Sequence, residues 1–143
     1  MIGIVIVAHG GLAKEYLAAV EYVVGAQPGL QAVSIEADHV RDEKQQEICS
    51  VANKVDEGDG VIIVTDMFGS SPSNLSLSAC APADRRIIYG ANLPLLLKLA
   101  KSRSKSVGDA VQCALEAGRK YIDSQNISID KENNVSSDPN YLE

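Results

Sequence analysis

Two apolar runs of the chain end in residues that could do chemistry together. Residues 4–8 lead into His9-Gly10-Gly11, and residues 61–64 lead into Thr65 and Asp66. A carboxylate that accepts a hydrogen bond from one imidazole nitrogen fixes the tautomer of the ring and leaves the other nitrogen as a nucleophile. The two stretches therefore indicate nucleophilic chemistry on His9, with Asp66 as the residue that orients it.

The loops around these two residues favour an anionic group on His9. A helix is predicted to begin after each loop, so backbone N–H groups and the positive end of a helix dipole face the same space. Gly10 allows a ligand to approach the backbone closely, and Ser71 before Pro72 is typical of a helix N-cap. We therefore predict that His9 accepts a phosphoryl group, with Gly10, Ser70 and Ser71 as candidate phosphoryl-binding residues.

Four mostly apolar runs, at residues 4–7, 32–35, 61–64 and 87–89, must position these loops. The first and third are continuous and β-branched, as in strands covered by helices on both faces. The segments between them have helical spacing, so we predict an open, doubly wound, mainly parallel α/β sheet of four strands. Sites in such sheets form beyond the carboxyl ends of the strands. A third loop there holds Asn92, a further candidate phosphoryl ligand that could instead simply shape a turn.

Composition places the chain among soluble, single-domain proteins. The chain has 143 residues, 45% of them hydrophobic, and a net charge of −6, which argues against a nucleic-acid surface. The three cysteines are far apart and form no C-x-x-C pair, so we predict neither disulfides nor a metal site, and no cofactor. The first apolar run is too short for a membrane span or a signal peptide, so we expect a cytoplasmic protein without membrane insertion.

The C-terminal region and one internal loop have less distinctive sequences. We predict one domain over residues 1–130 and a poorly ordered polar tail over residues 131–143. Residues 126–129 alternate polar and apolar side chains, which is typical of a short edge strand. His39 lies in a polar loop, where no partner is evident, and is interpreted as an ordinary loop residue.

Three motifs resemble those of the mannose-family IIA components of the sugar phosphotransferase system (PTS), over residues 1 to about 122. Ala8-His9-Gly10 is similar to the phosphorylated-histidine motif of that family. The second motif is matched by DMFGSSPSN at residues 66–74, and the third by GANLP at residues 90–94. Three motifs in the same order make the resemblance specific.

The resemblance implies a histidine phosphocarrier with phosphotransferase activity. Such a protein takes a phosphoryl group from the small carrier protein HPr and passes it to a IIB histidine, in phosphoenolpyruvate-dependent sugar phosphorylation and import. The resemblance also implies that Asp66 orients His9 and that Ser71 holds phosphoryl oxygens. It implies a homodimer that exchanges an antiparallel edge strand, here near residues 126–129.

Four other classes of protein share part of this pattern. A regulatory IIA protein, whose phosphorylation state is itself the output, differs in biology rather than in chemistry and stays open. The phosphocarrier subunit of a dihydroxyacetone kinase lacks the Ser-Pro-x-Asn pattern that begins here at Ser71. A tetrapyrrole metal chelatase needs a second metal ligand, and the chain has only His9 and His39 as histidines. A histidine phosphatase has arginine where this chain has Ala8.

Overall fold

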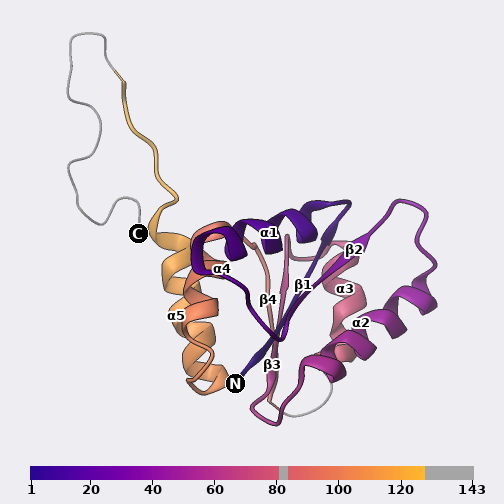
Figure 1. Ribbon diagram of the computed structural model, residues 1–143. Coiled ribbons are helices and arrows are strands. Elements are labelled where there is room, and N and C mark those ends of the chain that lie inside the picture. The colour runs from indigo at the N-terminus through magenta and orange to yellow at the C-terminus, as the bar shows by residue number, and fades with distance from the viewer. Residues whose placement is uncertain (81–83, 128–143) are drawn as a thin grey trace.

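A computed structural model describes residues 1–80 and 84–127, which form a four-stranded parallel sheet between two layers of helices (Figure 1). The order of the strands in the sheet is β2-β1-β3-β4. The direction in which the chain adds strands therefore reverses between β1 and β3, which is where ligands bind in sheets of this kind. The strands are β1 (Gly3–His9), β2 (Leu30–Ile35), β3 (Val61–Thr65) and β4 (Arg85–Ile88).

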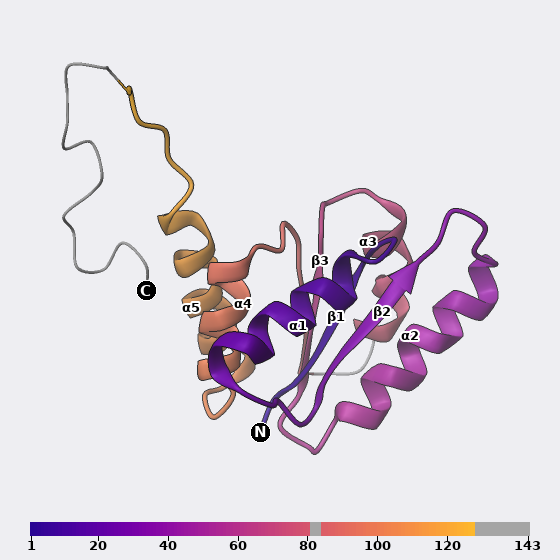
Figure 2. The ribbon, with the colours of Figure 1, turned by 45° about the horizontal axis from the view of Figure 1, so that its top comes forward.

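Alternating side chains of the central strands fill two separate cores. Ile4 and Ile6 of β1 face one core, and Val5 and Val7 face the other; all four are fully buried. The first core is covered by α1 (Leu12–Val24), α4 (Leu93–Lys101) and α5 (Val107–Lys120). The second is covered by α2 (Arg41–Val55), α3 (Ser71–Ser76) and the short 3-10 helix η1 (Leu77–Cys80), as Figure 2 shows from a second side.

The predicted α/β architecture is confirmed, with all four strands parallel and helices on both faces of the sheet. The two strands predicted to be buried on both faces, β1 and β3, are covered along nearly their whole length. None of the helices in the described part of the chain is long and apolar enough to cross a bilayer.

One strand begins earlier than its apolar residues indicate. β4 starts at Arg85, two residues before the apolar run at Ile87, because the Arg85 side chain is buried by polar partners and is only 5% exposed. Its guanidinium donates to Asp56 Oδ2 at 2.9 Å, to Asn53 Oδ1 at 2.8 Å and to the Ala79 carbonyl at 3.1 Å. These contacts satisfy the two terminal nitrogens of the guanidinium, whereas Nε is buried without a partner among the described residues. A charged side chain can be buried when most of its donors are satisfied in this way, which hydrophobicity alone does not predict.

Part of the predicted C-terminal organisation lies outside the described residues. Asn126 and Ile127 have no regular secondary structure, and residues 128–129 of the predicted edge strand are not described. The same is true of the tail at residues 131–143. The exchanged strand, the domain limit at residue 130 and the character of the tail therefore stay predictions.

The Arg85 contacts predict a clear difference between two adjacent arginines. Arg85→Ala removes the Arg85 donor from Asp56 Oδ2 and from the Ala79 carbonyl, so we expect a loss of about 1–3 kcal/mol in the free energy of unfolding. Arg86→Ala removes an exposed side chain of the same strand and should change the free energy of unfolding by less than about 0.5 kcal/mol. Urea unfolding of both variants measures this, and equal losses would contradict the structural role of Arg85.

Candidate functional site

The topology of the sheet brings His9 and Asp66 into direct contact. β1 and β3 are parallel neighbours with Val7 opposite Thr65, so the residues that follow the two strands leave the sheet side by side, at the carboxyl ends of the strands. Asp66 Oδ2 lies 2.6 Å from His9 Nδ1 and also accepts the His9 backbone N–H at 3.0 Å. The Asp66 side chain is 12% exposed and that of His9 is 52% exposed. A mostly buried carboxylate thus orients a solvent-accessible imidazole through its Nδ1.

This contact determines which ring nitrogen can act as a nucleophile. A carboxylate oxygen only accepts, so Nδ1 of His9 carries the proton. In the neutral ring Nε2 then keeps its lone pair, and it makes no hydrogen bond to any residue that the structure describes. The tautomer follows from the hydrogen-bond network.

The environment of Asp66 favours the ionised carboxylate. Burial acts to raise its pKa, but the hydrogen bonds from the backbone N–H and ring of His9, together with the charge of that ring, outweigh burial and lower the pKa of Asp66 below its ordinary value. Oδ2 makes both contacts with His9, whereas Oδ1 is buried without a partner among the described residues. Asp66 therefore stays ionised at neutral pH and can balance positive charge on His9.

The turn from β1 into α1 depends on the glycine after His9. Gly10 has a φ of +55°, a conformation that favours glycine, and its N–H donates to the Ile35 carbonyl at 2.9 Å. That N–H is therefore used within the sheet. Gly10 offers space rather than a donor, since a Cβ built there meets nothing within 4 Å.

The serine-rich turn is arranged one residue differently from the prediction. Ser70, in an extended conformation, holds the N-cap position of α3, and Ser71 is the first helical residue, so the prediction that Ser71 is the cap is wrong. The Ser70 hydroxyl donates to the Met67 carbonyl at 2.8 Å and caps no helical N–H. Pro72 falls at the second helical position, where its missing N–H leaves no helix bond unmade.

Asn92 has a structural role that uses both ends of its amide. Its Oδ1 accepts the Leu95 N–H at 3.0 Å and so caps α4. Its Nδ2 donates to the Gly118 carbonyl in α5 at 2.8 Å. Both ends of the amide thus hold helices, as the alternative that Asn92 shapes the turn predicts, while the second Nδ2–H takes no part in these two bonds and phosphoryl binding by Asn92 stays a prediction.

A shallow pocket of about 400 Å³ opens beside the His9 ring. Three predicted site residues, His9, Gly10 and Ser71, line it together with Ile35, Glu36, Ala37 and His39. His39, which the sequence indicates only as an ordinary loop residue, is thus part of the pocket, and the residues around it give no chemical signal. The sheet order would have found it, since its loop follows β2, the other neighbour of β1.

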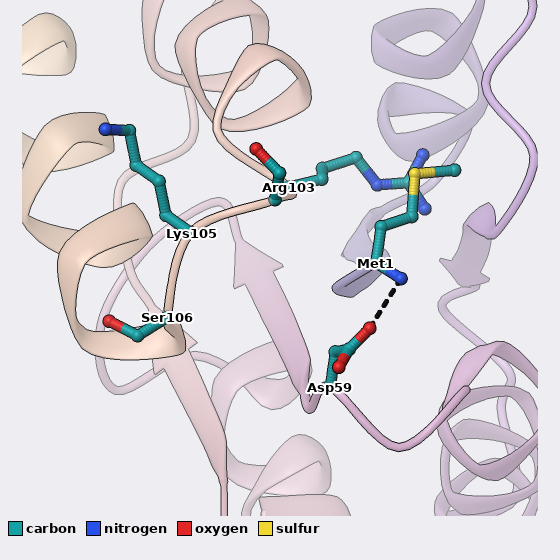
Figure 3. A pocket seen from close by; sticks show the side chains of 6 residues that line it. Met1, Asp59, Arg103, Lys105 and Ser106 are labelled. Carbon is teal, nitrogen blue, oxygen red and sulfur yellow. Dashed lines mark hydrogen bonds and ion pairs between the residues drawn. The ribbon is translucent and has the colours of Figure 1, made fainter.

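A second pocket lies at the other end of the sheet, beside the amino-terminal ends of β1 and β3. It has a volume of about 360 Å³ and is lined by Met1, Asp59 and residues 103–106 (Figure 3). The Met1 ammonium group binds Asp59 Oδ2 at 2.7 Å, and Arg103 Nε donates to the Ile2 carbonyl at 2.8 Å. No histidine or cysteine lines it. These contacts fix the start of β1 and provide no phosphoryl acceptor.

Comparisons with known proteins agree with the fold and with the motifs. The profile of the EIIA-man family, described as PTS system fructose IIA component, matches residues 3–115. The mannose-specific EIIAB component of Escherichia coli K12 is 29% identical over an alignment of 128 residues, and the match covers 85% of this chain and 38% of that relative. The YadI protein of Escherichia coli K12, named as a phosphotransferase enzyme IIA component, is 31% identical over 72% of this chain and 71% of its own length.

Among solved structures, the mannose/sorbose-specific IIA subunit from Enterococcus faecalis superposes with a TM-score of 0.79. The two sequences are 20% identical, and the match covers 89% of this chain and 96% of that one. The chain belongs to the mannose family of PTS IIA components, which is a family of phosphotransferases. It spans about 38% of the length of the EIIAB relatives that it matches.

The contact between His9 and Asp66 predicts how the carboxyl group of Asp66 titrates. We expect its pKa below about 3.9 in the unaltered protein. His9→Leu keeps a covering side chain but removes the ring hydrogen bond and charge, so the pKa of Asp66 should rise. NMR titration of the Asp66 carboxyl carbon measures both values, with His39→Leu as the control that should leave this pKa unchanged.

The sign of the accompanying change in stability follows from the same shift. Because the pKa of Asp66 is lower in the folded than in the unfolded chain, its ionised form stabilises the fold above about pH 3.9. This contribution is lost as the pH falls through the folded value. An Asp66 that titrates at or above its ordinary value would contradict the contact.

Proposed function

We propose that the protein is a histidine phosphocarrier of a sugar PTS. In this proposal His9 accepts a phosphoryl group from the phosphohistidine of HPr and passes it to a histidine of a IIB component. The observation that supports it most strongly is the contact between His9 Nδ1 and Asp66 Oδ2, which leaves an accessible Nε2 at the point where strand order reverses.

The chemistry is a transfer between two imidazole rings. The lone pair of His9 Nε2 forms the new N–P bond while the N–P bond of the donor breaks, and that electron pair returns to the donor ring. The His9 ring becomes positively charged, because its Nδ1 keeps the proton. Asp66 balances this charge without moving, so the carboxylate acts as a preorganised electrostatic partner. Transfer to the next histidine follows the same path in reverse.

Three features support phosphoryl binding beside the ring. The N-terminus of α1, a helix of 13 residues, follows His9 and Gly10 and presents N–H groups and a positive dipole end. Ser71 contributes a hydroxyl to the lining of the pocket. Gly10, whose positive φ favours glycine, lines the pocket without adding a side chain to it.

Phosphorylation in a reconstituted system tests this function. With phosphoenolpyruvate, enzyme I and HPr, the intact mass of the protein should increase by one phosphoryl group. His9→Gln should fold and show no increase, because it lacks the nucleophile. Asp66→Asn should be phosphorylated roughly 100-fold more slowly, because the ring is no longer held in one tautomer and orientation.

Asp59→Asn is the matched control for Asp66→Asn, since its carboxylate binds Met1 at the other end of the sheet. This variant should accept phosphate at the rate of the unaltered protein. Phosphorylation of the His9→Gln variant, or an unaltered protein that accepts nothing from phospho-HPr, would contradict the proposed function.

The proposal includes a homodimer that exchanges residues 126–129. Two apolar side chains near the end of the described chain support it: Ile122 is 73% exposed and Ile127 is 85% exposed. In addition, β2 and β4 each have one edge that is unpaired among the described strands. An alternating segment that added to such an edge in a second subunit would bury these apolar groups and cover the edge.

Truncation of the chain after Gln125 separates assembly from phosphorylation. The truncated protein should still be phosphorylated on His9, because the site lies within one subunit, but it should lose the dimer. Light scattering of both proteins gives their masses. A full-length protein that is monomeric at micromolar concentration would rule out the exchange.

A further inference from the structure

We propose that His39 binds the phosphoryl group when His9 carries it. This inference rests on the proposed phosphocarrier function and adds a residue to its site. His39 reaches the site from the loop after β2, whereas His9 ends β1 and Asp66 follows β3. Three neighbouring strands would then each supply one residue of the site: His9 carries the phosphoryl group, Asp66 orients His9, and His39 binds the phosphoryl oxygens.

The pocket beside His9 brings the two histidines together. Both line the same space of about 400 Å³, with Ser71 also in its lining. One water molecule occupies roughly 30 Å³ in the liquid, so the pocket has room for a phosphoryl group and several waters. The loop that carries His39 thus lies against the same pocket that His9 lines, and a phosphoryl group in that pocket would have both residues beside it.

The hydrogen bond of the His39 ring defines what it can offer. Its Nδ1 lies 2.8 Å from the Glu36 carbonyl oxygen. A carbonyl oxygen only accepts, so Nδ1 carries a proton. Nε2 makes no hydrogen bond within residues 1–80 and 84–127. When the ring is cationic, Nε2–H is therefore a free, charge-assisted donor for a phosphoryl oxygen.

The charges around the pocket explain why a cation is needed there. Asp66 lies behind His9, and Glu36 is part of the lining. The pKa of Glu36 is lowered by its own backbone N–H and then by Lys44, so it is ionised at neutral pH. Lys44 of α2 binds it at 3.3 Å, and Lys14 of α1 acts on it through its charge. Of the side chains in the lining, only His39 can add positive charge beside a phosphorylated His9.

Loss of this donor should destabilise the phosphorylated protein rather than the fold. A hydrogen bond to a charged group contributes enough that its removal shifts an equilibrium by about tenfold. His39→Ala should therefore shift the phosphoryl equilibrium toward HPr by about that factor. His39→Gln, whose amide keeps an uncharged donor, should show a smaller shift and serves as a second variant if the alanine protein folds poorly.

The experiment equilibrates each protein with phospho-HPr and measures the phosphorylated fraction by intact mass. Asp38→Asn, a change in the adjacent exposed residue of the same loop, is the control and should behave as the unaltered protein. A second readout is the ¹⁵N resonance of His39 Nε2. It should move to the position of a protonated nitrogen when His9 is phosphorylated, which a merely structural role of His39 would not cause.

The two proposals fail in different ways. If the unaltered protein accepts no phosphoryl group, the phosphocarrier function is wrong and the role of His39 is wrong with it. If the unaltered protein is phosphorylated, the two His39 variants are compared with it in their phosphoryl equilibrium and in the ³¹P resonance of their phosphohistidine. If His39→Ala and His39→Gln leave both of these unchanged, only the role of His39 is overturned. An unmoved His39 Nε2 resonance would also overturn it.

Discussion

The site depends on one carboxylate oxygen that accepts two hydrogen bonds from the same residue. Oδ2 of Asp66 binds the backbone N–H of His9, which fixes the end of β1, and the ring Nδ1, which fixes the side chain. Position, ring orientation and tautomer of the proposed nucleophile thus all follow from a single partner. Because Asp66 is largely shielded and His9 is not, the ring is held from the protein side and open on the side where a partner would approach.

The sheet supplies the rigidity that this interaction requires. Apolar side chains of β1 and β3 are fully buried between two helical layers, and close packing of this kind leaves the strand ends little freedom. The start of β1 is fixed separately, where Met1 binds Asp59 and Arg103 binds the Ile2 carbonyl. The residues proposed to take part in the chemistry lie at strand ends and in loops, and the packed strands hold them in place, as is usual in α/β proteins.

The sequence was sufficient for the central part of the site but not for its periphery. His9 and Asp66 follow continuous apolar runs, so the runs that predict two buried strands also place both residues at the carboxyl ends of strands, where sites of parallel sheets form. Hydrophobicity could not place Arg85, which is buried through polar contacts, and spacing could not show that both ends of the Asn92 amide hold helices together. His39 depends on which strand lies beside β1, and that order is a property of the whole sheet rather than of any local pattern.

In the proposed function Asp66 holds the proton on His9 Nδ1 and so directs the phosphoryl group to Nε2. Coupling between ³¹P and ¹⁵N in protein labelled at its histidine rings, phosphorylated by phospho-HPr, identifies the phosphorylated nitrogen directly. We expect phosphorus bonded to Nε2 of His9, with Nδ1 protonated in the same ring. Phosphorus bonded to Nδ1 would contradict it, since that nitrogen could not then donate to Asp66.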